Sequence, residues 1–289
     1  MNYVLHLCIM IGIYLILAYS LNLVLGYCGL LSLCHAAFYG IGAYTYTLLI
    51  MHFKIPFFLA LLLAVIITGI IAFLLGIPGL RFRGDPFVLV TLGFQIIIFS
   101  ILYNWISLTR GPYGIPGIPR PEVFGIPIDS IHKYFLFVFF IVAIVAIVLF
   151  KIYRSPFGLA LKALREDEKA AESLGKSAYH YFLWAFTIGG AIASISGALY
   201  ASYITYIDPT SFTLDESIFQ VVILLVGGAG NLIGPTLGTI FMILLPEALR
   251  FLGLPDTIAA NVRQIIYGGI LILLMYFRPQ GIKGEFKIK

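Results

Sequence analysis

Long stretches without a formal charge constrain this chain more than any other feature of its sequence. Residues 1–53 contain no Asp, Glu, Lys or Arg, and residues 181–207 and 217–246 are also uncharged. About 20 apolar residues in a helix cross a bilayer core about 30 Å thick. Hydrophobic residues make up 61% of the chain, whereas a soluble domain has roughly 45–50%. We therefore predict an integral membrane protein.

The apolar runs predict an all-α fold, a polytopic membrane helix bundle of about eight spans in a single domain, residues 1–289. Helices are favoured because lipid offers no partner to backbone polar groups, and the sequence lacks the alternating ten-residue segments typical of membrane barrels. The proline-rich residues 109–130 predict an ordered external loop. The expected spans are two within 1–53 divided near 26–29, then 55–78, 86–103, 134–150, 181–207, a broken pair within 217–246, and 262–277.

The distribution of Lys and Arg predicts the orientation, because cytoplasmic loops carry an excess of both. When the spans are threaded alternately, 12 of the 18 Lys and Arg residues lie on one side of the membrane. They are Arg81 and Arg83, the six cations from Lys151 to Lys176, and the four at the carboxyl end. This side is predicted to be cytoplasmic, and the amino terminus is predicted to face outward.

A charged segment, residues 155–177, lies between two expected spans. Residues 163–175 alone carry six formal charges, although only 11% of the chain is charged. Ser155 followed by Pro156 is a favourable helix start, and Gly175 is a plausible helix stop. The charges lie on one face of the expected amphipathic helix, within which a turn is expected. The apolar residues of the other face are Phe157, Ala160, Leu161, Leu164, Ala171 and Leu174.

Three functions compete for the charged segment. A helix in the membrane interface usually carries Lys and Arg on its polar face, whereas acidic residues balance the basic ones here. Residues 175–177 read Gly-Lys-Ser, but a P-loop follows a buried strand and surrounds phosphate with glycine amides, and this segment follows charged helix. Amphipathic helices commonly dock in a groove of another protein. We therefore favour a docking helix for a cytosolic partner.

Several motifs resemble those of one membrane-protein family. KAAESLG, residues 169–175, resembles the EAA loop of ABC-importer permeases, with Lys169 in place of the leading Glu. Together with REDEKAAESLG, four further motifs are similar to the LivM-type permeases of branched-chain amino acid importers. They are LRFRGDPFVLVTLGF (80–94), RGPYGIPGIPRP (110–121), GGAGNLIGPTLG (227–238) and YFRPQG (276–281). Related permeases for urea share much of this pattern, so urea or another small polar solute is an alternative cargo.

The resemblance implies a permease subunit of the cell membrane that is not an enzyme. It implies as partners a second, LivH-like homologous permease, two cytosolic ABC ATPases and an extracytoplasmic substrate-binding protein, with lipid around the chain and no nucleic acid. ATP and Mg²⁺ would be used by the ATPases, and no metal or cofactor is expected in this chain. The charged segment would be the cytoplasmic coupling helix. Its expected coupling residues are Leu164, Arg165, Glu166, Asp167, Glu168, Ala170, Ala171 and Gly175.

Polar side chains within apolar runs are candidates for the translocation path, because polar groups at membrane depth usually face a cavity or a neighbouring helix. These candidates are Asn22, His35, Gln95, Gln220 and Asn231. For His35, a purely structural role beside a backbone carbonyl competes with a role in the path. The expected path has no charged site, which suits an apolar side chain.

Small residues predict where helices break and where they pack closely. Transporters often build their central passage from two broken helices, and small residues four apart let helix backbones approach. The expected break and packing glycines are Gly26, Gly29, Gly227, Gly230, Gly234 and Gly238. Two further rows of small residues in residues 181–207 are Gly189, Ala193, Gly197 and Ala201, and Gly190, Ser194, Ala198 and Ser202.

An ATP-independent secondary carrier or channel is the rival class. Carriers driven by protons or sodium usually place carboxylates at mid-membrane, whereas all 13 Asp and Glu residues here fall in expected loops or near span ends. An importer subunit is therefore favoured. The sequence does not specify the solute, nor whether the chain pairs with a homologue or with a second copy of itself.

Overall fold

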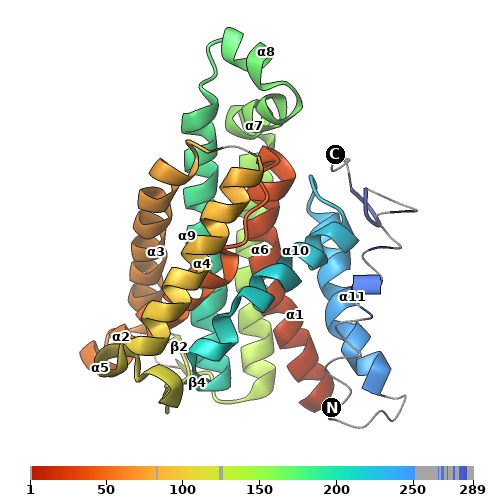
Figure 1. The fold of residues 1–289 in the computed structure, drawn as a ribbon. Coiled ribbons are helices and arrows are strands. Elements are labelled where there is room, and N and C mark those ends of the chain that lie inside the picture. Colours follow the sequence, from red (N-terminus) through yellow and green to blue (C-terminus); the bar gives the residue numbers. More distant parts are fainter. Residues whose placement is uncertain are drawn as a thin grey trace.

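The computed structural model describes residues 2–82, 84–123, 126–250, 266, 268–269, 272, 276 and 280–284. Long helices form a bundle, and two short helices project from one end of it (Figure 1). The long helices are α1 (Asn2–Leu21), α2 (His35–Phe53), α3 (Phe57–Gly79), α4 (Asp85–Asn104), α6 (Ile131–Arg154), α9 (Ala178–Ile204), α10 (Leu214–Gly227) and α11 (Ile233–Arg250). The projecting helices are α7 (Pro156–Glu166) and α8 (Glu168–Ser173).

Five of the described helices are long and apolar enough to cross a membrane: α1 with its continuation to Tyr27, α3, α4, α6 and α9. The outer faces of α3, α4 and α6 expose large apolar side chains, such as Leu62, Leu89 and Leu136. These faces suit lipid, and the all-α polytopic bundle is confirmed. The count of eight spans stays a prediction, and the expected span at 262–277 lies largely outside the described residues.

Helix α9 packs against α1, α2 and α3 through its small residues. A Cβ added at Gly197 would lie 2.1 Å from the carbonyl oxygen of Tyr39 in α2, and one added at Gly190 would lie 2.7 Å from Ala72 Cβ in α3. Gly189 approaches Ser20 and Val24 in the same way. The predicted rows of small residues are therefore contact surfaces, and they bring three helix backbones close to α9.

Two helix breaks occur where glycine was expected to cause them. The first helix changes to π geometry in η1 (Asn22–Tyr27), and residues 29–34 are not helical before α2 begins. Residues 228–232 separate α10 from α11 in the same way. We call residues 26–34 the first break and residues 227–232 the second break. Gly29, Gly228 and Gly230 have φ values of +71°, +98° and +96°, a region that glycine adopts at little cost.

The end of the bundle opposite α7 and α8 holds the proline-rich loop (Figure 1). This loop contains no regular helix between Gly114 and Ser130 among its described residues. Strand β1 (Ile115–Pro116) pairs antiparallel with β4 (Tyr206–Ile207), and β2 (Glu122–Val123) pairs with β3 (Ile126–Pro127). Two short helices, α5 (Ile106–Thr109) and η2 (Gly111–Tyr113), precede these strands, and η3 (Pro209–Phe212) follows β4. For residues 114–123 and 126–130, the prediction that this stretch forms no regular helix is confirmed, and its external position stays a prediction.

Candidate functional site

The charged segment folds as two short helices joined at Asp167. Ser155 caps α7, with its Oγ 3.3 Å from the Gly158 backbone N, and Pro156 occupies the first helical position. Asp167 has extended backbone angles and caps α8 by accepting a hydrogen bond from the Ala170 N–H at 3.0 Å. Gly175, at φ +79°, follows the end of α8. The predicted start, internal turn and stop are therefore confirmed.

The apolar face of the charged segment packs on the bundle, with one exception. Ala160, Leu161, Leu164 and Ala171 are buried. The ring of Phe157, which is half-buried, stacks on Tyr181 with centroids 5.5 Å apart. The prediction that Leu174 belongs to this face is wrong, because its side chain is 82% exposed. The turn at Asp167 changes the helix direction, so the single-helix periodicity that grouped Leu174 with the others does not continue through α8.

Arg165 is the second departure from the predicted amphipathic pattern. Glu166, Asp167, Lys169 and Ala170 are exposed, and Glu168 is half-buried. The Arg165 side chain, however, is only 7% exposed. It donates one hydrogen bond to the backbone carbonyl oxygen of Gly26 and a second to Glu166 Oε1 at 2.7 Å. Its predicted position on the solvent-facing polar surface is therefore wrong.

The charged segment contacts the first break through two cations one helical turn apart. Arg165 reaches Gly26, and a Cβ added at Gly29 would lie 3.0 Å from Arg165 Cγ. Lys162 places its Nζ 5.1 Å from the centroid of the Tyr27 ring. The last carbonyl groups of a helix lack intrahelical donors and carry partial negative charge. The two cations therefore suit the carboxyl end of the first helix.

Asn22 joins the two breaks. Its Oδ1 accepts a hydrogen bond from the Gly230 N–H at 3.0 Å, and its Nδ2 donates to the Asn231 carbonyl at 2.9 Å and to the Tyr153 hydroxyl at 3.3 Å. A Cβ added at Gly26 would lie 2.7 Å from the Gly230 backbone N. The two breaks are thus in direct contact at Gly26 and Gly230.

The second break is also held by residues near the carboxyl end for which the sequence predicted no packing role. Asn231 Nδ2 donates to the Lys283 carbonyl at 2.7 Å, and the Ile282 N–H donates to the Val226 carbonyl at 2.9 Å. Gly228 lies against Gly281 and Gly284. No local signal marks residues 280–284 as partners of the second break, because this contact spans about fifty residues of sequence.

Glycines in α10 and α11 allow these two helices to turn back on each other. A Cβ at Gly227 would lie 2.1 Å from the Gly234 carbonyl oxygen, and one at Gly238 would lie 2.1 Å from the Ile223 carbonyl oxygen. These are approaches to backbone atoms, which cannot rotate away. The predicted packing role of Gly227, Gly234 and Gly238 fits this geometry.

Gln95 caps the amino terminus of α2 from the neighbouring helix α4. Its Oε1 accepts from the Ala37 N–H at 2.7 Å and from the Ser217 hydroxyl at 3.1 Å, and its Nε2 donates to the Phe212 carbonyl at 2.8 Å. Ser217 in turn accepts from the Ala36 N–H at 3.0 Å. The side chain of Gln95 is fully buried. Gln95 thus supports the first turn of α2, where backbone N–H groups lack full intrahelical pairing. The sequence suggested a place in the translocation path for Gln95 and did not indicate this capping role.

Replacing Gln95 with leucine is expected to lower the stability of the protein by about 2–4 kcal/mol, because it removes the Gln95 partner of the buried Phe212 carbonyl and Ser217 hydroxyl and one of the two acceptors of the Ala37 N–H. Gln95→Glu keeps an acceptor at the helix end and is expected to cost less. Thermal unfolding of the two purified variants in detergent measures the difference. Equal unfolding temperatures for Gln95→Leu and the wild type would contradict the cap role.

The other polar candidates differ in their surroundings. His35 and Gln220 are fully buried. His35 Nδ1 lies 3.4 Å from Ser32 Oγ, and its Nε2 lies 3.8 Å from where a Cβ of Gly189 would be. Gln220 donates to Glu216 Oε1 at 3.2 Å. Asn231, by contrast, lines a pocket. The structure therefore does not gather the five polar candidates in one place.

Comparison with known proteins identifies the family. The family model described as branched-chain amino acid transport system / permease component matches residues 3–275. This chain belongs to that family. As a transport permease component, it is a multi-pass membrane protein and not an enzyme.

Individual relatives support the same assignment. The permease is 36% identical to the high-affinity branched-chain amino acid transport system permease protein LivM of Salmonella typhimurium, across 93% of this chain and 67% of the relative. It is equally similar to LivM of Escherichia coli. It is also 26% identical to LivH of Escherichia coli, across 96% of this chain and 92% of the relative. No solved structure matches this permease.

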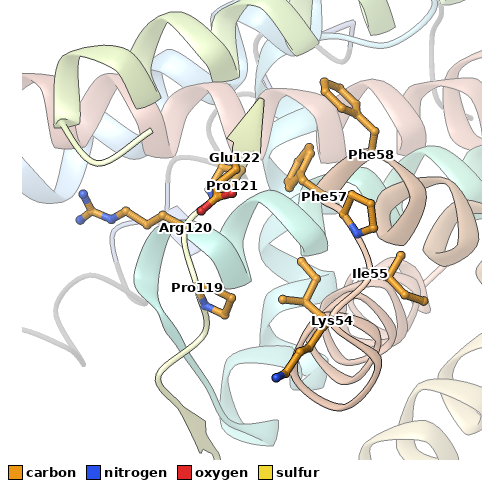
Figure 2. A pocket seen from close by; sticks show the side chains of 10 residues that line it. Lys54, Ile55, Phe57, Phe58, Pro119, Arg120, Pro121 and Glu122 are labelled. Carbon is orange, nitrogen blue, oxygen red and sulfur yellow. The ribbon is translucent and has the colours of Figure 1, made fainter. Parts of the chain in front are cut away.

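Two pockets lie at opposite ends of the permease. One of about 780 Å³ lies beside the two breaks and the charged segment, and its walls include Tyr27, Tyr153, Lys162 and Asn231. The other, of about 550 Å³, lies between the start of α3 and the proline-rich loop. Figure 2 shows the apolar side chains of Ile55, Phe57 and Phe58 on one side of this pocket and residues 119–122 on the other. Among the described residues, no group of three His, Cys, Asp or Glu side chains could hold a metal ion.

Proposed function

We propose that this permease is one transmembrane subunit of an ABC importer for branched-chain or other hydrophobic amino acids, and that it couples to cytosolic ATPases through α7 and α8. The observation that carries the coupling proposal is the charged segment itself. It projects from one end of an otherwise apolar bundle (Figure 1), and its tip presents acids, a lysine and the 82% exposed Leu174. An exposed apolar side chain among charges suits a groove on another protein.

The charged segment is proposed to be cytoplasmic. Arg81, which precedes α4, belongs by threading to the same side as the cations of α7, and such an excess of Lys and Arg marks the cytoplasmic side. The carboxyl end, which carries further cations, is placed on this side as well. Alternate threading back from Arg81 and from the charged segment then places the amino terminus and the proline-rich loop on the outer side.

The proposed complex contains two permease subunits, two ATPases and an extracytoplasmic binding protein. Similarity to both LivM and LivH of one organism supports a second, homologous permease as the partner. ATP and Mg²⁺ are assigned to the ATPases, so the proposal includes no cofactor or metal in this chain. It includes membrane lipid around the helices and no nucleic acid. Recognition of the charged groups of the amino acid is assigned to the binding protein.

The two joined breaks are proposed to lie beside the translocation path. Asn231 lines a pocket there, and Asn22 holds the first break against it. Alternating access then requires that binding and release of ATP favour different arrangements of the bundle. Gln95 and Gln220, which are buried in contacts with neighbouring residues, fit a supporting role better than direct contact with solute. A path role for His35 stays a prediction.

Truncating Leu174 to alanine is expected to weaken binding of the ATPase subunit about 10- to 100-fold. This range corresponds to about 1.5–3 kcal/mol for burying a leucine side chain at an interface. Tyr113→Ala is a matched control, because Tyr113 is 79% exposed but lies at the opposite end of the bundle. Co-purification from membranes containing all subunits measures the association. Equal recovery of the ATPase with both variants would refute docking at α8.

A further inference from the structure

We infer that Arg165 does not contact the ATPase but connects the charged segment to the two helix breaks, so that movement of α7 is transmitted to the proposed path. This inference rests on the proposed coupling function of α7 and α8 and assigns the internal connection that such coupling needs. Arg165 is therefore a positioning residue. It acts through the backbone of the first break.

The placement of Arg165 excludes it from the docking surface. Its side chain is 7% exposed, whereas that of its neighbour Glu166 is 66% exposed. The guanidinium donates to the Gly26 carbonyl and to Glu166, which links a solvent-facing carboxylate to the helix backbone inside the bundle. Charged side chains are almost never this buried unless they are paired. The guanidinium of Arg165 therefore reaches inward to the first break through its bond to Gly26.

The aliphatic part of Arg165 is held in place as closely as its guanidinium. A Cβ added at Gly29 would lie 3.0 Å from Cγ and 3.6 Å from Cδ of Arg165. Gly26 thus binds the guanidinium of Arg165, and Gly29 lies against the aliphatic part of the same side chain. Beside it, Lys162 lies over Tyr27, and the Tyr27 ring stacks on Tyr153 with centroids 3.8 Å apart. Helix α7 therefore moves only if the first break moves with it, or if these contacts break.

The first break passes the movement to the second break. Gly26 packs against the Gly230 backbone, and Asn22, one helical turn earlier, bonds to Gly230 and Asn231. Close-packed contacts of this kind shift between discrete arrangements more readily than they compress. A continuous route of contacts thus runs from Glu166 on the surface, through Arg165 and Gly26, to Asn231 at the pocket.

The test uses the full complex in liposomes and measures amino acid taken up per ATP hydrolysed. Arg165→Gln is expected to retain ATPase association and ATP hydrolysis while uptake per ATP falls at least tenfold. Arg165→Lys keeps a cationic donor and is expected to recover part of that ratio. The control is Lys151→Gln, because Lys151 is an exposed cation in the last turn of α6 and is not among the residues that line the pocket beside the breaks. It is expected to keep the wild-type ratio.

A second variant disturbs the same contact from the other side and leaves Arg165 in place. Gly29→Ala puts a methyl group against Arg165 at a φ of +71° and is expected to lower uptake per ATP as Arg165→Gln does. Gly84→Ala is its control, because Gly84 has a φ of +66° and no heavy atom within 4 Å of an added Cβ. Because Gly84 also has a positive φ, backbone strain alone would lower uptake per ATP in Gly84→Ala as well.

The outcomes separate the two proposals. The inference would be overturned if Arg165→Gln or Gly29→Ala kept the wild-type uptake per ATP. It would also be overturned if Arg165→Gln lost ATPase association in parallel with uptake, because Arg165 would then be a docking residue. If the wild-type chain takes up amino acid without ATP, or binds no ATPase, the proposed function itself fails. Low uptake per ATP with intact association supports the connection through Arg165.

Discussion

Replacing Gly197 with alanine is expected to destabilise the permease by about 3 kcal/mol or more. Overpacking a core usually costs about 1–3 kcal/mol, and the added methyl here would meet atoms that cannot rotate away. A Cβ at Gly197 would lie 2.1 Å from the Tyr39 carbonyl oxygen and 2.7 Å from the Ala43 backbone N. Helices α2 and α9 would have to separate, which would disturb the centre of the bundle.

The matched control for this prediction is Gly93→Ala in α4, where an added Cβ meets no heavy atom within 4 Å. Alanine in a helix interior is favoured over glycine by roughly 0.5–1 kcal/mol, so this variant is expected to be neutral or slightly more stable. Thermal unfolding of both proteins in the same detergent measures the difference. Equal unfolding temperatures would show that α2 and α9 are not in close contact.

Replacing Asn22 with alanine is expected to abolish uptake while the protein still inserts in the membrane. The change removes hydrogen bonds to Gly230, Asn231 and Tyr153 in one step. Each buried backbone group left without a partner costs about 1–3 kcal/mol. The two breaks would then lose their polar connection, and the second break would no longer be held beside the first. Uptake by the reconstituted complex measures the loss.

Two further variants sharpen the test of Asn22. Asn22→Asp can still accept from Gly230 but cannot donate to Asn231 when it is ionised, so it is expected to be as inactive as alanine. Asn104→Ala is the control, because this exposed side chain donates to the Ser100 carbonyl within its own helix and, in the described part of the chain, bonds to no other helix. It is expected to retain uptake. Full activity of Asn22→Ala would mean that the contact between the breaks is not needed for transport.

Local chemistry explains why many elements could be predicted. The start of α7 follows from Ser155 and Pro156, whose capping hydroxyl and fixed φ act within one turn. The second break follows from glycines that adopt positive φ at Gly228 and Gly230. Each of these signals acts over a few residues, so it can be read without knowing which other part of the chain lies nearby.

The roles of individual polar residues could not be predicted in the same way. Gln95 is a polar residue within an apolar run, which suggested a place in the translocation path. Its partners Ala37, Phe212 and Ser217 lie 58, 117 and 122 positions away in the sequence. Leu174 was misplaced because one helical period was carried through the turn at Asp167. Arg165, which precedes that turn, was misplaced because its side chain reaches the Gly26 carbonyl of the first break. Their exposure depends on how α7 and α8 rest on the bundle, which periodicity alone does not specify.

The sequence by itself determined that this chain is a membrane helix bundle, where its helices break, and which short segment is charged. These properties follow from the transfer of apolar residues into lipid and from local backbone preferences. Only the tertiary structure decided that the two breaks touch through Asn22, that Gln95 caps α2, and that Arg165 turns inward to Gly26. The physical reason is that a hydrogen bond depends on positions in space, and the partners here are brought together by packing between helices distant in sequence.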